Sequence, residues 1–139
     1  MDDLEILVRL VAATAFGAAI GWERERKRKP AGLRTHALVG LASALMIAAV
    51  DAALLGGADP SGVSRAVQGV VTGVGFIGAG AILRYEGGVA GITTAASIWM
   101  AAGLGVAAGL GEYLLGVAGV VLGFIVLLLL RELEPTGGE

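Results

Sequence analysis

The sequence contains no cysteine and few charged residues. Without cysteine the chain can form no disulfide, no thiolate metal site and no cysteine nucleophile. Charged residues make up 16% of the 139 residues, against about 25% in an ordinary soluble domain. Hydrophobic residues make up 56%, and the mean hydropathy is +0.83. These values favour a single membrane domain over a soluble globular enzyme.

The common catalytic and nucleotide-binding motifs are also missing. There is no G-x-x-x-x-G-K-[ST] phosphate loop, no H-E-x-x-H motif and no nucleophile beside an evident base. Residues 73–78, Gly-Val-Gly-Phe-Ile-Gly, do match the G-x-G-x-x-G pattern. A dinucleotide-binding turn needs an acidic residue about 20 positions later, and residues 98–103 contain no carboxylate. We therefore expect neither enzymatic activity nor nucleotide binding.

Five segments are long and apolar enough to cross a bilayer, which takes about 20 mostly apolar residues per helix. They are residues 4–22, 37–55, 66–83, 92–111 and 113–130. The sequence therefore predicts an all-α integral membrane protein with a five-helix membrane domain over residues 1–131. The acidic N-terminus and the absence of a cleavage site predict that the first segment is retained. We expect the polar, glycine-rich residues 132–139 to form a short disordered cytoplasmic tail.

The basic residues predict the orientation of these helices. If the loop 23–36 is cytoplasmic, five crossings place eight of the ten basic residues inside and leave Arg9 and Arg65 toward the outside. This asymmetry follows the positive-inside rule. We therefore expect the N-terminus outside and the C-terminus in the cytoplasm.

Glycine is abundant, with 24 residues, and small residues recur four positions apart. This spacing favours close helix packing and oligomerisation in lipid, where apolar burial alone does not drive association. The pairs are Gly17/Gly21, Gly40/Ala44, Gly69/Gly73, Gly105/Gly109 and Gly119/Gly123. They predict GxxxG-type packing and a homo-oligomer.

The third predicted helix carries further glycines on several faces. They are Gly73, Gly75, Gly78 and Gly80. Such a helix either packs at the centre of the bundle or unwinds beside a cavity, where protein or water satisfies the freed backbone groups. Both alternatives remain open.

Polar residues lie near the predicted outer face. They are Asp51, Asp59, Arg65 and Gln68, with Glu5 and Arg9 spaced i, i+4 for an ion pair. Carboxylate oxygens suit Mg²⁺, so Asp51 and Asp59 are candidates for a magnesium site. A solvated acidic surface is the alternative explanation.

A denser polar cluster lies at the predicted cytoplasmic face. The loop 21–36 has six basic and two acidic residues, a net charge of +4, which would attract anionic lipids. A helix N-terminus with threonines beside arginines also suits an anion, although Glu23 or Glu25 could pair those arginines instead. The candidate site comprises Glu23, Arg24, Glu25, Arg34, Thr35, His36, Thr93, Thr94 and Ser97. Lipid anchoring and a structural role for His36 are the alternatives.

Several ordered motifs resemble the membrane domain of the MgtC/SapB family. They are GWERER at 21–26, AGLRTH at 31–36, Asp59-Pro60, the glycine-rich stretch 65–83 and GITTAASIW at 91–99, within about residues 4–125. The resemblance implies a polytopic bacterial inner-membrane protein. Family members are linked to growth in low magnesium, survival in macrophages and, in some cases, inhibition of the F-type ATP synthase. It does not imply an established magnesium transporter.

The resemblance also implies a set of family-typical positions and one difference. The positions are Glu23, Arg24, Glu25, Gly32, Arg34, Thr35, His36, Asp59, Arg65, Gln68, Gly73, Gly75, Gly78, Gly80, Thr93, Thr94, Ser97 and Trp99. Longer members carry a cytoplasmic C-terminal domain of ACT-like fold, which we do not expect after Arg131.

Two functions follow as hypotheses. The first is a non-enzymatic membrane regulator whose cytoplasmic face recognises a membrane protein such as the F-type ATP synthase, an anionic lipid headgroup or a small anion. The alternative is a transporter or channel for Mg²⁺ or another cation, with Asp51 and Asp59 at the entrance and residues 73–80 as the path. A purely structural membrane protein is a third reading, and we expect no nucleic-acid partner.

Overall fold

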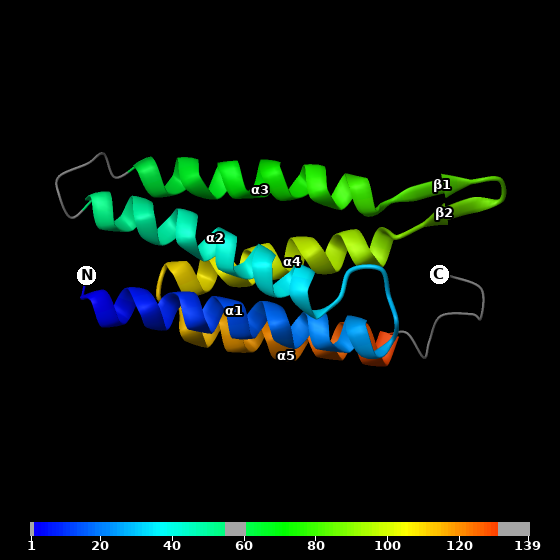
Figure 1. The fold of residues 1–139 in the computed structure, drawn as a ribbon, viewed down its shortest axis with the longest axis horizontal. Coiled ribbons are helices and arrows are strands. Elements are labelled where there is room, and N and C mark those ends of the chain that lie inside the picture. The colour runs from blue at the N-terminus through cyan, green and yellow to red at the C-terminus, as the bar shows by residue number, and fades with distance from the viewer. Residues whose placement is uncertain (1, 55–60, 131–139) are drawn as a thin grey trace.

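The computed structural model describes residues 2–54 and 61–130, and these are mainly helical. The helices are α1 (Asp3–Arg26), α2 (Leu33–Leu54), α3 (Ser61–Ala81), α4 (Ile92–Gly109) and α5 (Tyr113–Leu129). Consecutive helices run in opposite directions along one long axis (Figure 1). Helix α4 contacts all four other helices, whereas α3 lies at one edge against α2 and α4. An all-α bundle is thus observed, as the sequence predicts.

Three of these helices are long and apolar enough to cross a bilayer. They are α1, α2 as far as Ala53, and α4. Helix α5 is apolar but has only 17 residues. Helix α3 contains several glycines as well as Arg65 and Gln68, so a smaller share of its residues is strongly apolar. The described residues therefore agree with a membrane protein by length and composition.

Glycines bring α1, α2 and α4 into backbone contact. A Cβ atom added at Gly21 would lie 2.8 Å from the Gly32 carbonyl oxygen, and one added at Gly40 would lie 2.6 Å from the Ala13 carbonyl oxygen. At Gly105 the added atom would collide with the Gly40 backbone. Such close approach increases dispersion contact between helices without requiring a hydrophobic driving force. The glycines of this central layer are therefore structurally required.

Helix α3 differs from both sequence-based alternatives, because it is neither central nor broken. It is continuous from Ser61 to Ala81, and its buried residues, Val70, Val74 and Gly78, form one stripe. A Cβ atom added at Gly73, Gly75 or Gly80 would meet no heavy atom within 4 Å. The centre is taken by α4, in which alanines are buried. Alanine keeps a helix thin while still supplying a packing methyl group, which glycine does not.

A short β-hairpin joins α3 to α4, over residues that the sequence predicts as the connection between two helices except for residues 82–83. Strands β1 (Leu83–Tyr85) and β2 (Gly88–Ala90) pair antiparallel, with Arg84 opposite Val89. The turn includes Gly87 at φ +114°, a conformation that glycine adopts without steric cost. The hairpin extends past the helix ends (Figure 1). It ends α3 at Ala81 rather than at residue 83.

Candidate functional site at the basic end of the bundle

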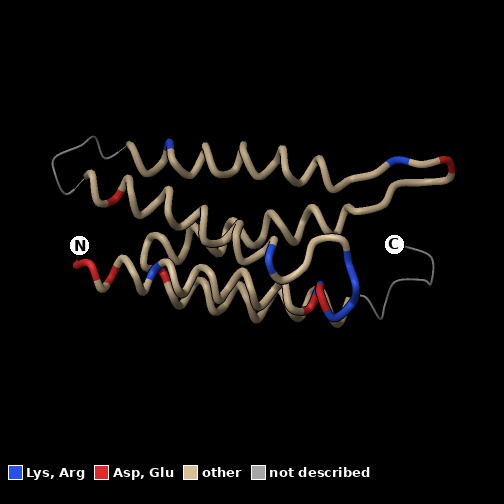
Figure 2. The backbone as a smooth tube through the Cα atoms, in the orientation of Figure 1, with Lys and Arg blue, Asp and Glu red and all other residues tan. Residues whose placement is uncertain are grey.

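The charged residues divide between the two ends of the bundle. Figure 2 shows that the basic residues gather where α1 ends, α2 begins and the hairpin lies. Arg9 and Arg65 are the basic residues at the other end of the described structure. The predicted cytoplasmic-face residues therefore lie at one end, which we call the basic end.

Four of these residues form a buried polar network between α1, α2 and α4. The Arg24 guanidinium donates to Thr94 Oγ1 at 2.8 Å, and His36 Nε2 lies 2.9 Å from Ser97 Oγ. All four side chains are at most 4% exposed. Buried polar groups are costly unless they are hydrogen-bonded. The network therefore ties the helices together from inside and does not form a recognition surface.

The contact made by the other ring nitrogen of His36, Nδ1, determines which of the two nitrogens carries the proton. His36 Nδ1 lies 2.8 Å from the Gly32 carbonyl oxygen, which can only accept, so Nδ1–H is the donor. In a neutral imidazole Nε2 then accepts from the Ser97 hydroxyl. Ser97 Oγ is also 2.9 Å from the Thr94 carbonyl oxygen, so its single proton has two possible acceptors.

Replacing Thr94 by valine removes the Oγ1 acceptor and keeps a β-branched side chain of similar size. We expect the free energy of unfolding to fall by about 1 to 2 kcal/mol, because the buried Arg24 guanidinium loses a hydrogen-bond partner. The contributions of hydrogen bonds between membrane helices lie at the low end of this range. Unfolding followed by circular dichroism in detergent measures the change. Thr72→Val, at an exposed position of α3, is the control, and an equal loss in both variants would refute the role of the network.

The two predicted glutamates at this end have different environments. Glu23 is 4% exposed, and its Oε2 atom has no hydrogen-bond partner among the described residues. Glu25 is exposed, and its Oε2 atom accepts a 2.8 Å hydrogen bond from the Leu33 amide at the start of α2. A carboxylate there complements the positive end of the helix dipole. Neither glutamate forms an ion pair within the described residues.

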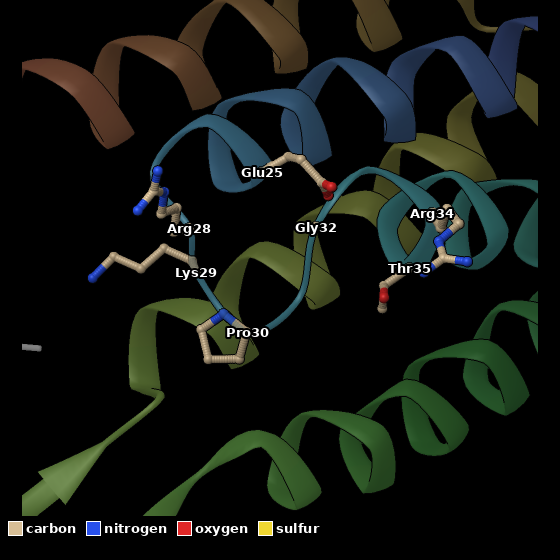
Figure 3. Close-up of a pocket in the computed structure, with 7 residues that line it drawn as sticks. All are labelled: Glu25, Arg28, Lys29, Pro30, Gly32, Arg34 and Thr35. Atoms are coloured by element: carbon tan, nitrogen blue, oxygen red, sulfur yellow. The ribbon is translucent and has the colours of Figure 1, made fainter.

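An open, polar pocket of about 380 Å³ lies between the end of α1 and the start of α2 (Figure 3). Its lining residues are Glu25, Arg28, Lys29, Pro30, Gly32, Arg34 and Thr35. Figure 3 shows the Glu25 carboxylate turned toward Gly32, with Arg28 and Lys29 on one side of the loop and Arg34 on the other. Three cations against one carboxylate make this the candidate binding site.

The pocket includes Arg28, Lys29 and Pro30, which were not among the predicted site residues. The Lys29 amide donates to the Arg24 carbonyl and the Arg28 amide to the Glu25 carbonyl, the two hydrogen bonds of a Schellman C-cap. Arg28 takes the left-handed position at φ +52°, where glycine is usual. These residues could have been found in the sequence from one signal, a helix end that has no glycine and lies within a run of basic residues.

Thr93 belongs to a different, apolar recess of about 270 Å³ between α1, α4 and α5, which Ile20, Ser97 and Val126 also line. The N-cap of α4 is Gly91, and no side chain caps it. The predicted cytoplasmic-face residues are thus divided between the buried network, the basic pocket and this recess.

At the opposite end of the bundle, Arg9 forms hydrogen bonds with two acidic residues, Asp51 and Glu5. Its Nη1 atom donates to Asp51 Oδ2 and to the Gly109 carbonyl oxygen, both at 2.8 Å, and its Nε atom donates to Glu5 Oε1 at 3.1 Å. The described residues contain no group of three His, Asp or Glu that could hold a metal. In the described structure Asp51 therefore forms an ion pair with Arg9. Asp59 lies outside the described residues.

The other predicted polar residues of this end, Arg65 and Gln68, are exposed on α3. Arg65 Nη1 donates to Ser61 Oγ within the same helix. Neither residue is brought against Asp51 by a hydrogen bond or ion pair that joins the two helices in the described structure.

Comparison with known proteins gives one family. The family model described as "MgtC family" matches residues 10–136. "Putative magnesium transporter YhiD" of Escherichia coli is 44% identical over 136 residues, covering 93% of this chain and 62% of that protein. "Protein SrpB" of Synechococcus elongatus is 39% identical, covering 96% and 79%. "Protein MgtC" of Salmonella typhimurium is 38% identical, covering 91% and 52%. No solved structure matches the chain.

Proposed function

Because the chain belongs to the MgtC family, we propose that it is a multi-pass protein of the bacterial inner membrane and a non-enzymatic regulator of a magnesium-linked process. The chain spans less than two thirds of the YhiD protein and about half of the MgtC protein. The link to magnesium rests on the name of the YhiD relative and on the family resemblance.

Five membrane crossings are part of this proposal. Helices α2 and α4 are both candidate spans, and they run in the same direction in Figure 1. A chain that crosses in one direction twice must return between the two crossings, and α3 is the segment that connects them. Helix α5 packs against α1 and α4 and supplies the fifth crossing. The gathering of basic residues at one end supports a cytoplasmic location for that end.

The observation that carries the regulator proposal is the basic pocket at this end. It is open, polar and rich in cations, as expected of a site for an anionic ligand or a partner's acidic group. Anionic lipids and a membrane protein such as the F-type ATP synthase are candidate partners, and a homo-oligomer is the expected assembly. The rival function, cation transport, is supported by the name of the YhiD relative.

Ion flux decides between these functions. Purified protein in liposomes should show no saturable Mg²⁺ flux above protein-free liposomes, because α3 is unbroken and Asp51 is held by Arg9. A fluorescent Mg²⁺ indicator inside the vesicles measures the flux, and K⁺ flux is measured in parallel. Saturable Mg²⁺ flux that Asp51→Asn abolishes would replace the regulator with the transporter.

A further inference from the structure

Helix α3 occupies a position in the bundle that does not match its composition. It lies at the edge, with α2 and α4 on one side of it (Figure 1). It is not one of the three described helices that are long and apolar enough to be identified as spans, yet the proposed function requires it to cross the bilayer. In a single copy of the chain its other side faces lipid, where polar groups are costly and normally contact protein or water. The outer face of α3 therefore requires a covering other than lipid.

Gln68 is a polar residue on this outer face that has no partner. It is exposed, and its side-chain amide makes no hydrogen bond in the described part of the chain. At about 1.5 Å per residue it lies about 10 Å along the helix from Ser61, inside a bilayer core of about 30 Å. A primary amide without a hydrogen-bond partner is costly to place in hydrocarbon. By contrast, the Thr72 hydroxyl donates to the Gln68 backbone carbonyl at 2.8 Å, so it needs no partner from another helix.

The same face allows another helix to approach closely. Gln68, Gly75 and Ala79 are all exposed and follow one another by seven and four residues, the spacing of a helix seam. A Cβ atom added at Gly75 or at Gly73 would meet no described heavy atom within 4 Å, so a neighbouring backbone can approach there. The Phe76 ring, 84% exposed, projects beside this row. The face thus has both a projection and depressions.

We propose that a second copy of this chain covers this face, with the two α3 helices side by side and parallel. This inference rests on the proposed function, because it needs α3 to cross the membrane. All copies insert in one orientation, so a two-fold axis along the membrane normal places each residue opposite its own counterpart. A primary amide both donates and accepts, so the two Gln68 side chains can hydrogen-bond to each other. This self-complementarity favours a second copy over an unrelated membrane protein.

The charge of α3 does not oppose this pairing. Arg65 is the single charged residue in the sequence of α3. Its guanidinium donates to Ser61 Oγ, toward the start of the helix and away from Gln68. Long basic side chains can in this way keep their charged group near the membrane surface. The row from Gln68 to Ala79 is therefore free of like-charge repulsion.

Disulfide cross-linking locates the interface, because the chain contains no cysteine of its own. Single cysteines are introduced into the full chain as Ala79→Cys in the proposed interface and as Val121→Cys in α5, where the valine is 52% exposed. The protein is reconstituted in phosphatidylcholine liposomes, oxidised with copper phenanthroline and separated without reductant. Ala79→Cys should cross-link on the order of tenfold faster, since association holds its two thiols close together. Equal rates in the two variants would overturn the proposal.

Two further variants test what stabilises the association. Gln68→Leu removes the amide, and Gly75→Leu fills the open side of the helix without touching the bundle. Each should weaken association on the order of fivefold or more, measured by energy transfer between differently labelled copies as added lipid dilutes them. Gln68→Asn should retain most of the association. If both leucine variants associate like the wild type, the proposal is wrong.

Folding is measured separately from association. Because Gln68 and Gly75 are exposed, neither leucine should lower the thermal midpoint of the helical circular-dichroism signal of dilute protein in detergent. Weaker energy transfer with an unchanged midpoint therefore reports the interface. A midpoint that falls in both leucine variants would mean that these positions support the bundle itself, and the outer face would not be an interface.

A labelling experiment distinguishes failure of this inference from failure of the proposed function. Ser64→Cys in α3 and Arg84→Cys in β1 lie near the two ends of α3, and an impermeant maleimide should label them from opposite sides of the membrane. Labelling from one side only removes the crossing by α3 and this inference with it. Labelling from opposite sides, combined with a monomer or with an interface elsewhere, removes only the pairing of α3 and leaves the regulator in place.

Discussion

Gly105→Leu should abolish the folded bundle. A Cβ atom at this position would collide with the Gly40 carbonyl oxygen and lie 2.9 Å from Gly40 Cα and 2.8 Å from Ser43 Cβ. Backbone atoms cannot rotate away as the end of a side chain can, so α4 would have to separate from α2. Overpacking in a core commonly costs about 1 to 3 kcal/mol, and more where the backbone must move. Because α4 contacts every other helix, we expect a loss above about 3 kcal/mol, a large share of the stability of a typical domain.

The matched control lies two residues earlier in the same helix. A Cβ atom at Gly103 would meet nothing within 4 Å. Gly103→Leu makes the same change in composition and in intrinsic helix propensity, which favours leucine over glycine by somewhat less than about 1 kcal/mol. Size-exclusion chromatography with fluorescence detection measures the fraction of monodisperse protein. Normal yield is expected for Gly103→Leu and little for Gly105→Leu, and equal yields would contradict the close contact between α2 and α4.

Arg9→Leu should give the second largest loss. Arg9, with its side chain 10% exposed, pairs with Asp51, 33% exposed, and with Glu5, 46% exposed. Removing one partner of a buried ion pair costs about 3 to 5 kcal/mol, and exposed pairs are worth less than about 1. Because both carboxylates are partly solvated, we expect a loss of about 2 to 3 kcal/mol. Chemical unfolding followed by circular dichroism gives the value.

A second substitution shows whether the charge of Asp51 causes this loss. In the Arg9→Leu background, Asp51→Asn removes the uncompensated carboxylate and should recover part of the stability, whereas in the wild type the same change should destabilise. Such coupling is expected for residues in direct contact. Additive effects of the two substitutions would mean that Asp51 does not depend on Arg9, and an entrance role for Asp51 would regain support.

The positions of the helices could be predicted because apolar length is a local property, and the starts of α4 and α5 at residues 92 and 113 were predicted as well. The helix ends on either side of the basic loop could not be predicted. Helix α1 continues to Arg26 and α2 begins at Leu33, whereas the apolar segments end at residue 22 and begin at residue 37. Hydropathy identifies the residues that suit lipid, and a helix can extend beyond them into water. The first residue of α2, Leu33, donates its amide hydrogen to Glu25, eight residues earlier. A pattern of apolar residues does not reveal this contact.

The candidate site shows the same limit. Its residue types were recognisable, but Arg24 meets Thr94 across 70 positions and His36 meets Ser97 across 61. Glycine is equally ambiguous. Gly105 is pressed against another helix, while Gly73 has open space beside it, and nothing in either residue distinguishes the two situations. The distinction lies in which helix becomes the neighbour.

The central position of α4 has a consequence for how the protein is made. The ribosome produces α1 and α2 first, and their close contact at Gly21 and Gly32 allows them to pair as a hairpin. Thr94 and Ser97, whose hydroxyls contact Arg24 and His36, are in α4, which is synthesised only after α3. During this interval the two polar side chains must be accommodated by water, lipid headgroups or the insertion machinery. Arrival of the fourth helix is therefore the step that gives these two buried side chains their partners across the bundle.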